Sequence, residues 1–151
     1  MMTARSDPAL LAAEQAVFER EITTVTQRYF PGWRTWRSWS IRCLDRSDIH
    51  GFHGKCLFQE RELQFTCPVD PGRWWLRALV IHECCHAILG QGHTPAWRRK
   101  MLQAARTAEL WESDTLAALL RMDVSNYRGR PRQQVQIFHR RHREQIRCDQ
   151  R

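Results

Sequence analysis

Hydrophobic residues recur with a helical period along the N-terminal part of the chain. Pro8 suits the first position of a helix that Ser6 or Asp7 can cap, and Pro31 with Gly32 would end it. The apolar positions of this segment are Leu10, Leu11, Val17, Phe18, Ile22, Val25 and Tyr29. Because they repeat every three to four residues, they predict one helix with a single buried face, which we interpret as scaffold.

A period of two replaces the helical period after this helix. Trp39, Ile41 and Cys43 alternate with polar residues, which predicts a strand with an apolar inward face. Two more alternating segments, residues 53–58 and 61–67, flank a short polar turn and predict a hairpin. The middle of the chain is therefore expected to form a small sheet.

Helical patterns return in the second half of the chain. Residues 74–89 are apolar on nearly every side, which predicts a central buried helix. A further helix is predicted for residues 95–111, and a shorter one, capped by Ser113 or Asp114, should close the core before Asn126. We expect a fold of the α+β class.

The composition is that of a folded domain. The chain has 151 residues, of which 42% are hydrophobic and seven are Trp, so one domain with a real core is expected. No apolar run is long enough to cross a membrane, and residues 1–7 lack the apolar region of a secretory signal. Six scattered cysteines suit a reducing compartment. We expect a cytoplasmic protein, associated with the nucleoid if it is bacterial.

Positive charge is concentrated at the C-terminal end. Residues 128–151 contain eight Arg against Glu144 and Asp149, which gives +6 of the chain's net +8. We therefore divide the chain into a domain, residues 1–127, and a basic extension that is expected to be flexible. Basic extensions commonly contact polyanions, so this segment is expected to bind DNA, although a solubilising tail without a fixed partner is the alternative. The candidate contacts are Arg128, Arg130, Arg132, Arg140, Arg141 and Arg143.

The chemistry of the chain centres on two histidines one helical turn apart. His82 and His86 share a face of the predicted helix, and Glu83 lies beside them. Two neutral imidazoles in this arrangement suit Zn²⁺, and a neighbouring carboxylate can take a proton from water. Gly90 can end the helix, so the chain can turn back and bring His93 over the same site. The pattern predicts metal-assisted peptide hydrolysis.

The motif resembles that of a known protease family. His-Glu-x-x-His at residues 82–86 is followed by a Gly-containing loop and by Gly-His-x-Pro-x-Trp at residues 92–97. This combination is similar to the SprT-like metalloproteases, whose eukaryotic members include a protease that acts on DNA–protein crosslinks. Residues 54–56 and 62–66 also look like the family's hairpin. The chain lacks the paired Cys-x-x-Cys of the zinc ribbon that often follows in the family.

The resemblance implies a fold, a set of ligands and a substrate. His82, His86 and His93 would bind zinc, and Glu83 would be the general base. The fold would be a minimal zincin-like domain, with a small antiparallel sheet packed on the N-terminal helix and on the helix that carries the motif. One strand of the hairpin would bind substrate as an added strand. The expected function is a zinc metalloendopeptidase that acts on DNA-associated or DNA-crosslinked proteins.

Three tryptophans lie just before and at the start of the first predicted strand. Trp33, Trp36 and Trp39 are spaced by three residues with Arg between them. Such a run can form a nucleic-acid stacking surface, because aromatic faces take unpaired bases and Arg takes phosphates. The alternative, which we favour, is that Trp39 belongs to the inward face of the first strand, while Trp33 and Trp36 cover an edge of the core.

Other functions remain open at this point. A nucleic-acid-binding protein of a phage or mobile element could keep zinc only as a structural clip. Such a clip needs a fourth protein ligand, for which His50, His53, Cys84 or Cys85 would have to turn inward, whereas we expect Cys84 and Cys85 to face the core. A peptidase for an unrelated protein, with an inert extension, is a further alternative.

Overall fold

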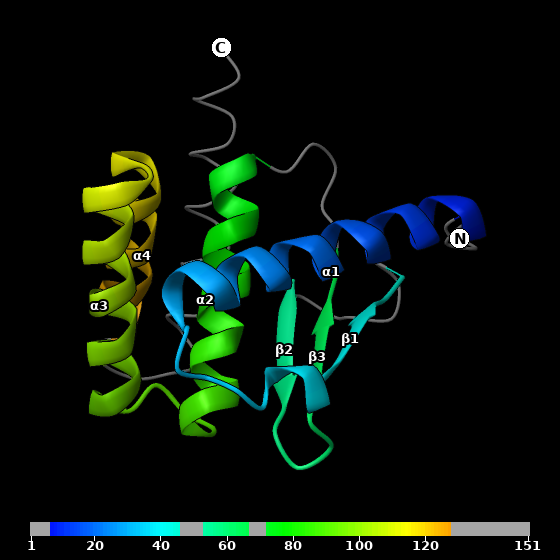
Figure 1. Cartoon of the computed structure of the whole chain (residues 1–151), viewed down its shortest axis with the longest axis horizontal. Helices are drawn as coiled ribbons and strands as arrows, with labels where there is room; N and C mark the ends of the chain where they lie inside the picture. The colour runs from blue at the N-terminus through cyan, green and yellow to red at the C-terminus, as the bar shows by residue number, and fades with distance from the viewer. Residues whose placement is uncertain (1–6, 46–52, 67–71, 128–151) are drawn as a thin grey trace.

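The computed structural model describes residues 7–45, 53–66 and 72–127 of the chain. These residues form a mixed α+β fold with four α-helices, a short 3₁₀ helix and a small three-stranded sheet (Figure 1). In chain order the elements are α1 (Pro8–Tyr29), η1 (Trp36–Ser38), β1 (Ser40–Cys43), β2 (Gly54–Leu57), β3 (Glu62–Phe65), α2 (Arg73–Leu89), α3 (Pro95–Trp111) and α4 (Asp114–Asn126). The α+β class predicted from the sequence is confirmed.

Helix α1 follows the predicted limits. The Asp7 side chain accepts a hydrogen bond from the backbone N–H of Ala9, and Pro8 occupies the first turn. One face of the helix buries Phe18, Ile22 and Val25. The Phe18 ring stacks on that of Phe65 in β3, with ring centroids 4.6 Å apart, so the apolar face of α1 covers the sheet.

The sheet differs from the antiparallel arrangement that we expected. Its order is β1-β3-β2, with β2 antiparallel and β1 parallel to the central β3. The predicted hairpin is confirmed, because β2 and β3 pair antiparallel. Strand β1 lies on the other side of β3, and β2 belongs to the segment of the chain that connects β1 to β3.

The outer edge of β1 is covered by α1. The side-chain amide of Gln15 donates to the carbonyl of Ile41 and accepts from the N–H of Cys43, both at 2.6 Å. Ile41 and Cys43 face inward while Ser40 and Arg42 are exposed, as the alternation predicted. Gln15 therefore bonds to backbone groups on the outer side of β1, and β2 forms the other edge of this sheet.

Helix α2 is the centre of the domain. Thirteen of its seventeen residues are buried, because α1, the sheet and the pair α3–α4 surround it (Figure 1). The buried residues include the pair Cys84 and Cys85, which belong to the hydrophobic core as expected. An element enclosed in this way holds its side chains in fixed positions.

Helices α3 and α4 begin where the sequence predicted. Thr94 accepts a hydrogen bond from the N–H of Trp97, and Ser113 accepts one from the N–H of Leu116. Each hydroxyl satisfies a backbone donor that the first turn of a helix leaves without a partner. Among the described residues, no helix is both long and apolar enough to span a membrane.

A buried ion-pair network ties the helices together. Arg77 of α2 pairs with Glu21 of α1 at 3.0 and 3.1 Å, and with Glu112 at the end of α3. Glu112 also pairs with Arg28 at 2.9 Å and accepts from the hydroxyl of Tyr29. The side chains of Arg77 and Glu112 are only 6% and 9% exposed, so the centre of the network is shielded from solvent, whereas Arg28 lies at the surface.

Candidate metal centre

Two short segments bring three histidines together. His82 and His86 stand one turn apart on α2, and both are buried. Helix α2 ends at Gly90, whose N–H donates to the carbonyl of His86. Gly90 and Gly92 have φ values of +95° and +90°, a region that favours glycine. These two glycines reverse the chain and return His93 to the face that carries His82 and His86.

The Nε2 atoms of the three histidines form a nearly equilateral triangle. The separations are 3.2 Å for His82–His86, 3.2 Å for His86–His93 and 3.3 Å for His93–His82. A tetrahedral ion with nitrogen ligands at about 2.0 Å places each pair about 3.3 Å apart. The spacing of the three nitrogens therefore fits a single metal ion, and this group could hold one.

The opposite nitrogens of two of these rings are held by oxygen atoms. Nδ1 of His82 lies 2.7 Å from Oδ2 of Asp123 in α4, and Nδ1 of His86 lies 3.2 Å from the carbonyl oxygen of Gly90. A proton on Nδ1 that is donated to oxygen leaves the lone pair of Nε2 free. Both contacts thus favour the tautomer that a metal ligand needs.

Aromatic rings fix the histidines from two sides. The indole of Trp97 is fully buried, and its centroid lies 4.6 Å from the His93 ring and 4.9 Å from the His82 ring. Tyr127 stacks on His93, with centroids 3.5 Å apart. Rings packed in this way have few rotamers available, so the triangle is preorganised.

The surroundings keep the imidazoles neutral. Burial lowers the pKa of His82 and of His86 to about 3, and burial together with the neighbouring histidines lowers that of His93 to about 2. Neutral imidazole is the form that binds a metal ion. At neutral pH no proton therefore has to be displaced from these rings.

Glu83 lies beside the triangle. Its Oε1 is 3.9 Å from Nε2 of His82, and the side chain is buried. Burial, and to a lesser extent the Asp123 carboxylate, raise the pKa of Glu83 to about 8. A cation held by the histidines would act in the opposite direction and favour the carboxylate. The Glu83 carboxylate therefore lies close to the three histidines that could hold a metal ion.

Gly54 provides the room for this carboxylate. A Cβ atom at this position would lie 3.0 Å from Cγ and 3.1 Å from Oε1 of Glu83, and 2.9 Å from Cδ1 of Leu79. Real side chains do not pack so closely without moving a neighbour. A larger residue at the first position of β2 would therefore require the side chains of Leu79 and Glu83 to shift.

The other candidate ligands lie elsewhere. Among the described residues, the group that could hold a metal contains His82, His86 and His93 but neither Cys84 nor Cys85. Burial raises the pKa of both thiols, which opposes formation of the thiolate that binds metal. His53 packs edge-on against Trp75, with centroids 5.1 Å apart. His50 and the six C-terminal arginines lie outside the described residues.

Asp123 and Tyr127 were missed by the sequence analysis. Asp123 follows Leu116, Leu119 and Leu120 at helical spacing, and it is fully buried. A carboxylate on the apolar face of a helix needs a partner, which is a signal that the sequence does contain. Tyr127 follows Asp123 after one more turn, and it carries no comparable signal.

Comparison of the chain with protein-family models, with curated proteins and with solved structures gave no match.

Proposed function

We propose that the chain is a zinc-dependent metalloendopeptidase of the SprT-like type that acts on DNA-associated or DNA-crosslinked proteins. One observation carries the proposal: the buried carboxylate of Glu83 lies beside three histidine nitrogens that have the spacing of ligands on one ion. The resemblance of residues 82–97 to the family motif supports the type of enzyme and the substrate class.

The donor set suits zinc. His82, His86 and His93 would supply three neutral nitrogen ligands, and three protein ligands are typical of catalytic zinc sites. When bound, zinc supplies Lewis acidity, which acidifies water and polarises the carbonyl of a peptide. Asp123, through its contact with Nδ1 of His82, would hold that ligand in place.

Glu83 would move the proton. It accepts a proton from water as the water oxygen bonds to the carbonyl carbon of the substrate. It then delivers this proton to the amide nitrogen as the C–N bond breaks and the amine leaves. The buried position of Glu83 keeps bulk water from competing for the proton.

Strand β2 would bind the substrate. Of the two edge strands, β1 has outer backbone groups bonded to Gln15, whereas the described residues place only the side chain of Gln91 on the outer backbone of β2. The carbonyl of His53 accepts a hydrogen bond from the N–H of Thr66, so the backbone groups of His53 point toward β3. Because this direction alternates along a strand, the N–H and C=O groups of Gly54 and Cys56 point away from β3. An extended peptide paired with these groups would pass beside Glu83, because Gly54 touches that side chain.

Gln91 occupies part of this edge. Its side-chain amide donates to the carbonyl of Cys56 at 3.4 Å. A bond of this length from an exposed side chain is weak, so a substrate N–H can replace it. Gln91 belongs to the same loop that positions His93.

The structural-clip alternative predicts a different coordination shell. It requires a fourth protein ligand, and within the described parts of the chain only the three histidines converge. X-ray absorption at the zinc edge distinguishes the two functions. Sulfur in the shell would assign Cys84 or Cys85 to the metal and would overturn the enzymatic proposal.

Replacement of Glu83 tests the function directly. Glu83→Gln should bind zinc as the wild type does but should cleave a DNA-bound protein at least about a hundredfold more slowly, because the proton acceptor is lost. Cleavage is measured by mass spectrometry of the products, with and without DNA, and zinc by elemental analysis. Glu109→Gln, which changes an exposed carboxylate of α3, is the matched control. Full activity in Glu83→Gln would remove this residue from the mechanism.

A further inference from the structure

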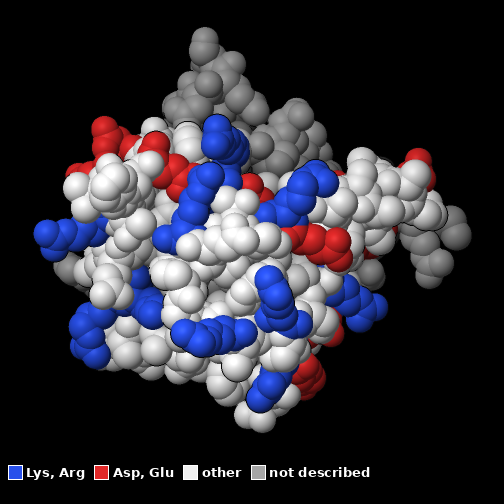
Figure 2. Space-filling model, viewed as in Figure 1, with Lys and Arg blue, Asp and Glu red and all other residues white. Residues whose placement is uncertain are grey.

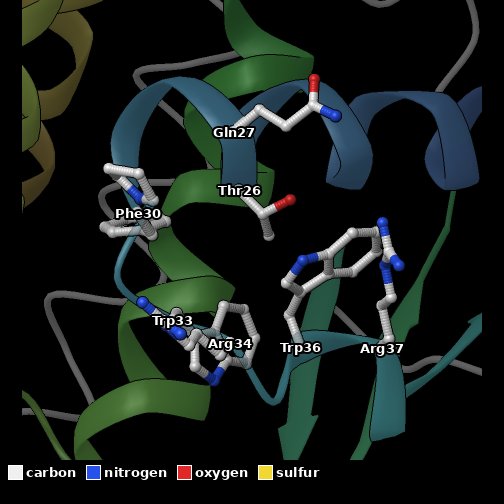
Figure 3. Close-up of a pocket in the computed structure, with 8 residues that line it drawn as sticks. Thr26, Gln27, Phe30, Trp33, Arg34, Trp36 and Arg37 are labelled. Carbon is white, nitrogen blue, oxygen red and sulfur yellow. The ribbon is translucent and has the colours of Figure 1, made fainter.

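An open pocket lies between the end of α1 and the segment that leads to β1. Its volume is about 380 Å³, which is within the range of small-molecule sites. The lining residues are Thr26, Gln27, Phe30, Pro31, Trp33, Arg34, Trp36 and Arg37 (Figure 3). None of them belongs to the metal centre, and the proposed protease function does not use them.

Two indoles form the aromatic part of this pocket. Trp33 and Trp36 pack against the core on one side but remain partly exposed, so the expectation that they cover an edge of the core is confirmed. Trp33 is braced edge-on by Trp39, with centroids 6.0 Å apart. Trp36 is held in the 3₁₀ turn η1. Each indole is therefore anchored while part of its surface lines the pocket.

The charges around the pocket are positive. Arg34 and Arg37 are exposed, and no carboxylate is among the lining residues. The guanidinium of Arg37 lies 5.4 Å from the centroid of Trp36, and Lys100 lies 5.6 Å from the centroid of Phe30. Figure 2 shows basic side chains spread over this face of the molecule, with fewer acidic ones among them.

We propose that this pocket binds an unpaired nucleotide of single-stranded nucleic acid. The base stacks on the exposed surface of Trp36 or Trp33, and Arg34 and Arg37 contact the flanking phosphates. Stacking on an indole tolerates any base, since every base has a π-face, and Arg suits phosphate through its planar set of donors. The assignment is independent of proteolysis and of the basic C-terminal extension.

Stacking on the indoles favours unpaired bases over a duplex. The bases of a duplex are stacked on one another and paired, so their faces cannot reach Trp36 unless the duplex opens. An acidic peptide would satisfy Arg34 and Arg37 but would leave the indoles without a ring to stack on. The combination of indoles and guanidinium groups therefore favours a ligand with alternating aromatic rings and anions.

The test compares two exposed tryptophans in the full-length protein. Binding of a fluorescein-labelled oligothymidylate is followed by anisotropy for the wild type, Trp36→Ala and Trp111→Ala. Trp111 is 84% exposed and lies outside the pocket, so it is a matched control. Trp36→Ala should weaken binding about tenfold, because one stacked base is lost, while Trp111→Ala should have no effect. Trp36→Phe should recover most of the affinity.

A strand with abasic sites separates stacking from charge. The wild type should bind it as weakly as Trp36→Ala binds the intact strand, and Trp36→Ala should not discriminate between the two. Because truncation of Trp36 could disturb the fold, the surface pair Arg34→Glu and Arg37→Glu provides a second variant, with Arg20→Glu and Arg106→Glu as the control. The pocket pair should bind the strand at least tenfold more weakly than its control.

Three results would overturn the proposal. Equal affinity of Trp36→Ala and Trp111→Ala for the oligothymidylate would show that the indole of Trp36 does not contribute to binding. Equal affinity of the wild type for intact and abasic strands would show that binding depends on charge alone and not on stacking of the bases. Displacement of the strand from the wild type, but not from Trp36→Ala, by a polyglutamate peptide would assign the pocket to acidic protein segments.

Discussion

Asp123 connects α4 to α2 through its contact with the imidazole of His82. Its Oδ2 lies 2.7 Å from Nδ1 of His82, and both residues are buried. A carboxylate behind a metal-binding imidazole fixes the orientation of the ring and makes its Nε2 a stronger donor to the ion. The affinity for the metal should therefore depend on α4 as well as on the histidines themselves.

Asp123→Asn should lower the affinity for zinc about tenfold. The amide keeps the size of the side chain but removes the charge that strengthens the imidazole, and loss of such partners typically costs 10- to 100-fold (about 1–3 kcal/mol). The measurement is competition with a chromogenic chelator. Asp114→Asn, on the exposed first turn of the same helix, is the control and should bind zinc normally. Wild-type affinity in Asp123→Asn would mean that His82 is positioned by packing alone.

The local part of the site could be predicted from the sequence, and the distant part could not. Helical spacing places His82, Glu83 and His86 close together, and the loop with Gly90 and Gly92 returns His93 to them. Rules that act over a few residues are therefore enough to predict this part of the site. Asp123 reaches His82 across 41 residues, and its place depends on how α4 packs against α2. Spacing carries no information on such packing.

The ion pairs of Arg77 connect α2 to α1 and to the C-terminal end of α3. Arg77 bonds to Glu21 of α1 and to Glu112 at the end of α3, although it belongs to the most enclosed helix of the domain. A buried guanidinium is tolerated only when its donors are satisfied, and removal of one partner leaves the remaining charges buried and uncompensated. The network therefore fixes how α1 and α3 lie against α2.

Arg77→Met should destabilise the domain by about 3 kcal/mol, because Glu21 and Glu112 lose their buried partner. Urea unfolding followed by circular dichroism measures the change. The control is Arg121→Met, which removes an exposed arginine that pairs with Glu109 at 2.7 Å. Water screens that pair, so its loss should change the free energy of unfolding much less. An equal decrease in the free energy of unfolding in the two variants would show that the Arg77 network stabilises the domain no more than an exposed ion pair does.

The elements themselves were predicted better than their arrangement. Residues 95–111 form α3 as expected, since Thr94 and Pro95 fix where the helix begins. The hairpin also follows from alternation around a short turn. The parallel pairing of β1 with β3 does not, because strand order depends on long-range contacts such as that of Gln15 with β1. A local pattern cannot distinguish a parallel from an antiparallel neighbour.

Most of the net charge of the whole chain belongs to the segment after the described domain. Residues 128–151 carry +6 of the net +8. Together with the aromatic pocket, the chain offers two candidate regions for nucleic acid that differ in kind. One would act through counterion release and depend strongly on salt, and the other through stacking and depend on the bases.

Replacement of Arg140, Arg141 and Arg143 by Gln should flatten the salt dependence of DNA binding. The slope of log K against log salt should fall by about two to three units, because three phosphate contacts are lost. Fluorescence titrations of the full-length protein at several salt concentrations give this slope. Arg20→Gln combined with Arg106→Gln, two exposed body arginines, should leave it nearly unchanged. An unaltered slope in the triple variant would identify the extension as a solubilising tail.

The register of β2 on β3 determines which residue lies beside Glu83. Gly54 pairs with Phe65 and has only a hydrogen atom facing Glu83. Since neighbouring residues of a strand replace one another when the register slips, a shift of β2 along β3 would bring a side chain, such as that of Lys55, toward this space. An ammonium group there would pair with the carboxylate and keep it from accepting a proton. The native register of β2 thus keeps the space beside the Glu83 carboxylate free of a side chain from residue 54.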